Sequence, residues 1–264
     1  MAISFSEGWM VPALAGLLGL VLGSFLNVCT FRWPADESVV RPPSHCPACE
    51  SAIRWYDNIP VFSYLVLRGR CRSCGVFISP QYPLIEVATG LIWAGVFVQH
   101  GLSVEALRGA LFLSVLLGIA VTDARFYIIP NEFSVGGGVL GLLLAPFPGG
   151  PTALQALVGA AVGFGFLWLV ARGGTWLFKK EAMGGGDLKM MAMVGAFLGI
   201  SGVVLTLFLG ALLGSLIFGP ISWKTGKLVP FGIFLAAGAA VAYGWGADLI
   251  GWYSTTFLGA GGVS

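Results

Sequence analysis

Two aspartates border long apolar stretches of the sequence. Asp123 ends one stretch, and Asp187 opens another directly after three glycines. Carboxylates are rare at such positions because removing their charge from water is costly, so each is a candidate functional residue. Two carboxylates held close together share one proton: the ionised member can activate a water molecule, and the protonated member can hydrogen-bond the carbonyl under attack. That is aspartyl protease chemistry. Alternatively, the two aspartates cap helix ends beside Arg125 and Lys189.

Residues near these aspartates are candidates for a supporting role. The small size and free φ of Gly184, Gly185 and Gly186 would let an extended peptide approach Asp187 closely. Lys189 follows within the same segment and is a candidate for contacting the substrate. Glu86, in "YPLIEVATG", opens another apolar stretch, where it either supports the site or makes a structural pair with a basic residue.

Four of the five cysteines form two Cys-x-x-Cys pairs. The pairs are "CPAC" at 46–49 and "CRSC" at 71–74, with twenty-one residues between them. This spacing is typical of a structural zinc site in which Cys46, Cys49, Cys71 and Cys74 surround one tetrahedral ion. Because all four positions are filled by protein, the metal would be structural and not catalytic. The alternative is two disulfides, which rarely persist in the reducing cytoplasm.

The composition indicates how these residues are positioned. The chain is 57% hydrophobic and 10% charged, against roughly 25% charged residues in a soluble domain. It is therefore predicted to be an all-α polytopic membrane protein with about eight transmembrane helices. Residues 1–10 contain no Lys or Arg, so a cleavable signal peptide is not expected. The predicted spans are 8–31, 83–99, 106–122, 133–147, 153–171, 188–200, 202–222 and 230–252, and the sixth and seventh are divided at Ser201–Gly202.

The basic residues predict the orientation of these spans. Thirteen of the fourteen Lys and Arg residues fall on one side of this map, and only Arg108 falls on the other. The positive-inside rule then puts the loop 32–82 in the cytoplasm and both termini outside it. Asp123 and Asp187 come to the same cytoplasmic edge. The expected organisation is a first span (1–31), a zinc-binding loop domain (32–82) and a transmembrane core (83–264).

Several motifs occur in an order that resembles one known family. They are "GSFLNVCTFRWP" (23–34), "RPPSHCPACESAIRWYDNIPVFSYLVLRGRCRSCG" (41–75), "YPLIEVATG" (82–90), "TDARFYIIPN" (122–131), "AMGGGDLKMMA" (182–192) and "VPFGIFL" (229–235). Together they resemble the type IV prepilin peptidases, whose GxGD signature matches "GGGD". Two local departures are "VPFGIFL" in place of the more common "IPFGPFL", and Cys29 where an aliphatic residue is frequent.

The resemblance implies an enzyme of the bacterial inner membrane. It would remove the basic leader from type IV prepilins and type II secretion pseudopilins after a glycine, with Asp123 and Asp187 as the catalytic pair. Many members also N-methylate the new terminus with S-adenosylmethionine, and the tetracysteine loop is typical of these bifunctional members. The residues that would bind the methyl donor cannot be named from the sequence.

Three other functions stay open at this stage. One is a peptidase without methyl transfer, because no glycine-rich dinucleotide-type turn occurs in the loop. Another is a transporter, although transporters hold their charged sites near the bilayer midplane, whereas these aspartates are predicted at one face. The third is a scaffold whose zinc loop binds a cytoplasmic partner. The expected partners are prepilins, pseudopilins and the lipid bilayer, with no nucleic acid.

Overall fold

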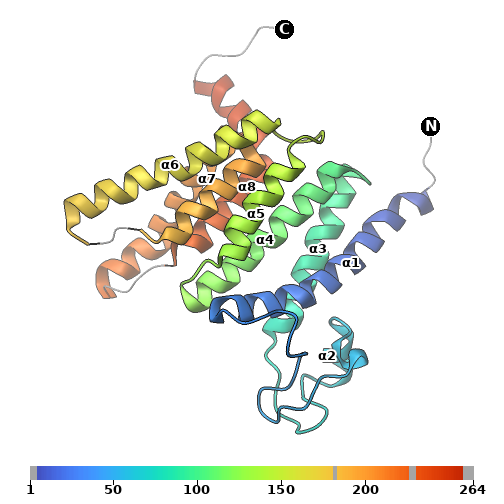
Figure 1. Ribbon diagram of the computed structural model, residues 1–264. Coiled ribbons are helices and arrows are strands. Elements are labelled where there is room, and N and C mark those ends of the chain that lie inside the picture. The colour runs from blue at the N-terminus through green and yellow to red at the C-terminus, as the bar shows by residue number, and fades with distance from the viewer. Residues whose placement is uncertain (1–4, 181–182, 226–229, 258–264) are drawn as a thin grey trace. The chain divides into compact units, whose positions relative to one another are not determined.

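The computed structural model describes residues 5–180, 183–225 and 230–257, and all of the regular elements within these ranges are helices (Figure 1). The prediction of an all-α chain is confirmed. Val229, part of the "VPFGIFL" motif, lies outside the described residues. The α helices are α1 (Phe5–Arg32), α2 (Phe62–Val66), α3 (Gln81–His100), α4 (Val104–Phe126), α5 (Asn131–Leu144), α6 (Ala153–Phe178), α7 (Gly185–Thr225) and α8 (Phe231–Phe257), and the 3-10 helices are η1 (Trp33–Ala35) and η2 (Trp55–Asn58).

Six of these helices are long and apolar enough to cross a membrane: α1, α3, α4, α6, α7 and α8. The protein is therefore a multi-pass membrane protein, as predicted. Helix α5, in the place of the span predicted at 133–147, has 14 residues. At 1.5 Å per residue it is about 21 Å long, which is shorter than the hydrocarbon layer of about 30 Å.

The chain reverses direction within α7 at Gly199, which has φ 69° and ψ −169°. A Cβ placed on Gly163 of α6 would contact both the Met191 carbonyl and Val203. These two residues are twelve positions apart, about 18 Å along a straight helix, so the two halves of α7 must run side by side in opposite directions. Two antiparallel helical segments are thus present here, and the division falls at Gly199 and not at Ser201–Gly202, because the glycine supplies the positive φ that the turn needs.

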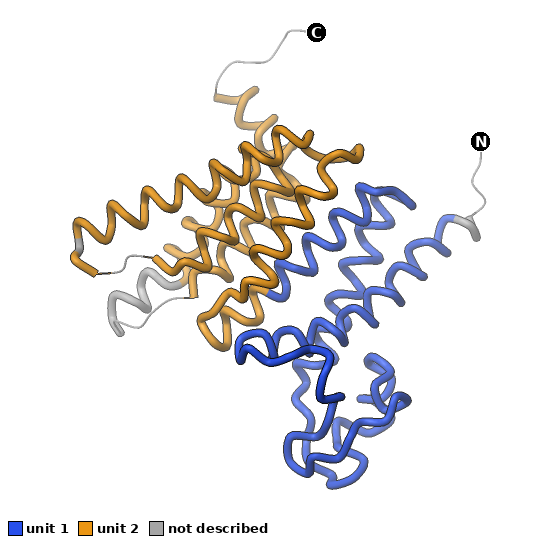
Figure 2. Tube along the Cα trace, viewed as in Figure 1, with its two compact units in different colours: residues 1–118 blue, residues 119–264 orange. Residues whose placement is uncertain are grey.

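Residues 1–118 form one compact unit, drawn in blue in Figure 2, in which α1 packs against α3. A Cβ on Gly19 would lie 2.8 Å from the Thr89 carbonyl oxygen, and one on Gly23 would lie 2.7 Å from the Glu86 Cα. Small residues on α1 therefore allow the two backbones to approach closely, which is how helices commonly associate in lipid.

Residues 119–264 form the second unit, drawn in orange, in which α7 packs against α5, α6 and α8 (Figure 2). The closest approach joins α6 to the first half of α7, where a Cβ on Gly159 or on Gly195 would run into the carbonyl of the other glycine. Gly238 of α8 likewise lies against the backbone of α7, since its Cβ would be 2.8 Å from the Thr206 carbonyl oxygen. This tight packing holds α7, the helix that carries Asp187, against its neighbours.

Candidate active site

Helix ends meet around Asp123 in the second unit. Asp123 lies in the last turn of α4, and the helix ends where Tyr127, with φ 56°, donates its amide to the Asp123 carbonyl oxygen at 3.0 Å. The side chain of Asp123 is 6% exposed. Its Oδ2 accepts a hydrogen bond of 3.0 Å from the backbone amide of Ile233, in the first turn of α8. This carboxylate is therefore held by a helix that begins more than a hundred residues later.

Asp187 lies in the first turn of α7 and is partly buried. Its carboxyl group is close enough to Asp123 for the two to interact electrostatically. The structure thus brings together the two aspartates that were singled out from the sequence. One stands at the C-terminal end of a helix and the other at the N-terminal end of another.

The glycines before Asp187 contribute space and not an unusual backbone conformation. None of Gly184, Gly185 and Gly186 has a positive φ, and a role of their conformational freedom in admitting the substrate stays a prediction. A Cβ on Gly185 would meet no atom within 4 Å, and one on Gly184 would lie 3.8 Å from Asp187 Oδ2. The surface beside Asp187 is consequently open at these two positions. Gly186 differs, because its Cβ would lie 3.0 Å from the Ile129 Cβ.

Lys189 and Glu86 both make contacts that hold the fold. The Lys189 ammonium donates a hydrogen bond of 2.8 Å to Asn131 Oδ1, which ties the start of α7 to the start of α5. Asn131 was not predicted as part of the site, although it ends the quoted motif "TDARFYIIPN". In the first unit, buried Glu86 accepts a hydrogen bond of 2.7 Å from the Val61 amide. Val61 has φ 61°, a rare conformation for a β-branched residue, so Glu86 fixes the loop at a strained point.

The two Cys-x-x-Cys segments form similar turns. The Cys46 amide donates to Ser51 and the Cys71 amide donates to Val76, at 3.0 and 2.9 Å, and the residue after each pair, Glu50 or Gly75, has a positive φ. No disulfide joins cysteines within the described residues, and the four Sγ atoms of the pairs lie within 4.8 Å of one another. The loop therefore presents four thiols to one point, and this cluster could hold a metal ion.

The spacing of the sulfurs fits zinc. With Zn–S bonds of about 2.3 Å, the edge of a tetrahedral site is about 3.8 Å, and the Cys46 and Cys74 sulfurs are 3.8 Å apart. The hydrogen bond with the Ser51 side chain lowers the pKa of Cys49 to about 6. The Val76 amide acts to lower the pKa of Cys74, but desolvation and the neighbouring thiols outweigh it and raise this pKa to about 12. A cation is thus needed before all four sulfurs can be thiolates together.

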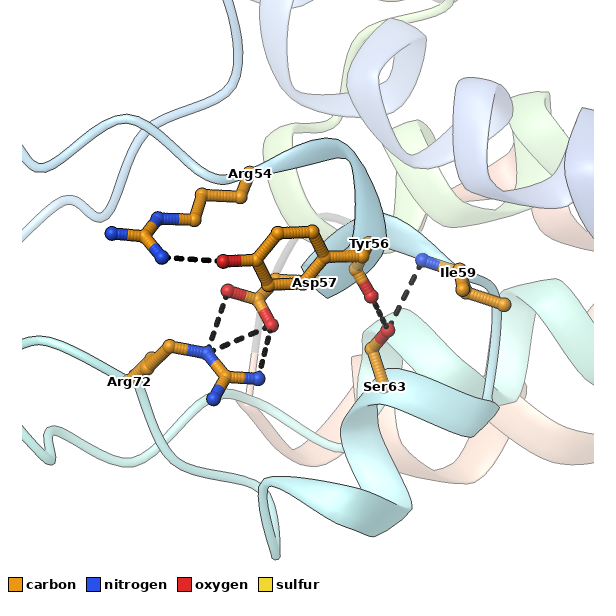
Figure 3. A network of polar contacts seen from close by, with 6 residues as sticks. All are labelled: Arg54, Tyr56, Asp57, Ile59, Ser63 and Arg72. Atoms are coloured by element: carbon orange, nitrogen blue, oxygen red, sulfur yellow. Dashed lines mark hydrogen bonds and ion pairs between the residues drawn. The ribbon is translucent and has the colours of Figure 1, made fainter.

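Polar side chains support the second cysteine turn from one side (Figure 3). The Arg72 guanidinium donates hydrogen bonds to both oxygens of Asp57, at 2.6 and 2.9 Å, and holds the pKa of Asp57 below its usual value. Tyr56 lies between two cations, because Arg54 hydrogen-bonds its hydroxyl and the Arg72 guanidinium lies 5.6 Å from its ring centre. These contacts tie the segment before α2 to the turn that carries Cys71 and Cys74.

A cavity of about 570 Å³ lies in the first unit between α1 and the cysteine loop. The Arg32 guanidinium lines it and donates 2.8 Å hydrogen bonds to the carbonyl oxygens of Ser38 and Pro42. Phe25, Ser24 and Asn58 also contribute to the wall. The volume is in the range of small-molecule sites.

Comparison with known proteins shows which family this chain belongs to. Residues 17–100 match the bacterial peptidase A24 N-terminal domain, and residues 110–219 match the type IV leader peptidase family. The prepilin leader peptidase/N-methyltransferase of Myxococcus xanthus is 42% identical over 91% of this chain and 69% of its own length. The chain belongs to the type IV leader peptidase family.

Other members of the type IV leader peptidase family agree over nearly their whole length. The Bacillus subtilis protein of the same description is 34% identical over 92% of this chain and 98% of its own length, and the Neisseria gonorrhoeae protein is 37% identical over 80% and 82%. No solved structure matches the chain. Both aspartates fall within the leader peptidase match and all four clustered cysteines within the N-terminal match, whereas Gly232 and Ile233 lie beyond either.

Proposed function

We propose that this protein removes the basic leader from type IV prepilins and type II secretion pseudopilins, with Asp123 and Asp187 as its catalytic pair. The observation that carries the proposal is the meeting of these two carboxylates where helix ends converge in the second unit. The names of the relatives, prepilin leader peptidases, support the substrate class. A transporter is disfavoured, because the two acids lie at the ends of helices and not midway along them.

The pair would hydrolyse the peptide bond as follows. One carboxylate takes a proton from water as the water oxygen bonds to the scissile carbonyl carbon. The other carboxyl group gives its proton to the carbonyl oxygen, which forms a tetrahedral diol. The carbon–nitrogen bond then breaks, one proton passes to the leaving amine, and a new carboxylic acid is left on the leader. The open surface at Gly184 and Gly185 would receive the extended peptide.

The same protein is proposed to methylate the new amino terminus with S-adenosylmethionine. When bound, this donor supplies an electrophilic methyl group to the amine. The cavity beside α1 is the proposed site: Arg32 would pair with the donor's carboxylate, Phe25 would cover its ring, and Asn58 would hydrogen-bond its polar groups. The N-methyltransferase part of the relatives' names supports this activity.

One experiment tests both activities. Purified protein in liposomes is mixed with a model prepilin, with and without S-adenosylmethionine, and the products are weighed by mass spectrometry. The expected result is loss of the leader in both reactions and the further mass of one methyl group only where the donor is present. Cleavage without added mass would leave a peptidase alone. An unchanged prepilin in both reactions would contradict the proposed function.

Zinc is proposed as the structural ion of the cysteine loop, and purified protein is expected to contain about one zinc per chain. Replacing the buried Cys46 by serine should abolish zinc binding, because three thiolates and a hydroxyl hold zinc much less tightly. Cys29→Ala, whose cysteine is buried in α1 outside the cluster, should keep its zinc. Metal analysis of both variants decides the point, and full zinc content in Cys46→Ser would overturn the assignment. Zinc content should also fall as the pH falls, because protons compete for the thiolates.

The bacterial inner membrane is the proposed location, with the zinc loop and the aspartates facing the cytoplasm. The distribution of Lys and Arg supports this orientation. The proposed division of labour follows the sequence: residues 1–31 anchor the loop, residues 32–82 hold the zinc, and residues 83–264 contain the peptidase core.

A further inference from the structure

The start of α8 packs against Asp123 without any intervening side chain. A Cβ on Gly232 would lie 2.8 Å from Asp123 Oδ2 and 3.0 Å from its Cγ, distances that real Cβ atoms scarcely tolerate. The missing side chain lets the backbone come close enough for the Ile233 amide to reach Oδ2 at 3.0 Å. An amide from the first turn of α8 therefore holds the Asp123 side chain.

Ile129 links this contact to the segment that carries Asp187. Its Cδ1 would lie 2.9 Å from a Cβ on Gly232, and its own Cβ would lie 3.0 Å from a Cβ on Gly186. Gly186 directly precedes Asp187. The Ile129 side chain thus fills the space between Gly232, which lies against Asp123, and Gly186, which precedes Asp187. A larger residue at either glycine would push its segment away from Ile129.

We propose that Gly232 and Ile129 are positioning residues for the aspartate pair. This inference rests on the proposed peptidase function. Gly232 allows the Ile233 amide to fix Oδ2 of Asp123, and Ile129 sets the separation of the two segments. With Oδ2 held by the Ile233 amide, Oδ1 would take the proton from the attacking water, while Asp187 would give its proton to the substrate carbonyl.

The test compares two substitutions within the same helix. Gly232→Ala introduces the Cβ that the contacts exclude, whereas Gly244→Ala places the same group where no atom lies within 4 Å. Displacing a catalytic group by about 1 Å can cost roughly 100-fold in rate. We expect kcat for leader removal to fall by at least about tenfold in Gly232→Ala, with KM within about twofold of wild type, because the substrate surface is unchanged. Gly244→Ala should match wild type in both constants.

A second variant separates positioning from stability. Ile129→Val removes Cδ1, the atom nearest to the Gly232 position, so it is expected to lower kcat and leave KM unchanged. In the double variant Gly232→Ala/Ile129→Val, the alanine methyl group can occupy part of the space left by Cδ1. We therefore expect kcat of the double variant to be about threefold higher than that of Gly232→Ala alone. Thermal unfolding of each purified variant shows whether it is folded. If Gly232→Ala does not fold, kcat of Ile129→Val alone decides whether the inference stands.

The possible outcomes are distinct. Equal kcat values for wild type, Gly232→Ala and Ile129→Val, in a protein that cleaves prepilin and loses that activity in Asp123→Asn, would overturn this inference and leave the peptidase intact. A rise in KM with unchanged kcat would also overturn it, since it would place these residues in substrate binding. A wild-type protein that does not cleave prepilin would remove both the proposed function and this inference.

Discussion

Leader removal is expected to slow by about 10²- to 10⁴-fold, or to become undetectable, when either Asp123 or Asp187 is replaced by asparagine. Asparagine has nearly the same shape but neither takes nor gives a proton at neutral pH. The Asp123→Asn side chain still offers an oxygen to the Ile233 amide, so the start of α8 should stay in place. The measurement is the single-turnover rate of prepilin cleavage, with enzyme in excess over substrate.

Asp248→Asn is the matched control for these two variants. Asp248 is an exposed carboxylate near the end of α8, and Asp248→Asn makes the same change from a carboxylate to an amide. Its variant should cleave at the wild-type rate. If Asp123→Asn or Asp187→Asn cleaved as fast as Asp248→Asn, that aspartate would not belong to the catalytic machinery.

Gly195→Leu is expected to prevent the second unit from folding. The backbones of Gly195 and Gly159 are in direct contact, and even a Cβ at either position would run into the carbonyl of the other. Overpacking a flexible core typically costs about 1–3 kcal/mol, and here the excluded atoms belong to two rigid helix backbones, so the cost should be higher. In size-exclusion chromatography, this variant should yield little or no monodisperse protein.

Gly165→Leu provides the comparison for this stability effect. Gly165 lies on α6, the same helix as Gly159, but a Cβ there would meet no atom within 4 Å. This variant should purify with the wild-type yield and melting temperature, because the new side chain can point into lipid. A stable, active Gly195→Leu would show that α6 and α7 do not pack in the described way.

The cysteine cluster and the two aspartates that come together could both be identified from the sequence. The pairs at Cys46 and Cys71 have a spacing that few other structures use, and Asp123 and Asp187 stand out because their apolar surroundings make a charge costly. These signals are local in the chain. They depend on residue type and spacing, both of which can be read without knowing the packing.

The missed features depend on contacts between distant residues. Gly199 reverses α7 inside an uncharged stretch where hydropathy does not change, so the break could be placed only to within a few residues. Gly232 lies in the motif "VPFGIFL", but its need to be a glycine comes from Asp123, more than a hundred residues earlier. Glu86 was expected to pair with a basic residue or support the site, and its carboxylate accepts a hydrogen bond from the Val61 amide, a partner that the sequence analysis did not name. The sequence around each of these residues does not reveal the contact or turn in which it takes part.

The most direct test of the account is a double-substitution cycle on the aspartate pair. Single-turnover cleavage rates are measured for wild type, Asp123→Asn, Asp187→Asn and the double variant, each checked for folding by thermal unfolding. Because the two carboxylates are proposed to act as one unit, the double variant should cleave no more slowly than the slower single variant. Rate losses that multiply, with each aspartate acting independently of the other, would contradict a catalytic pair.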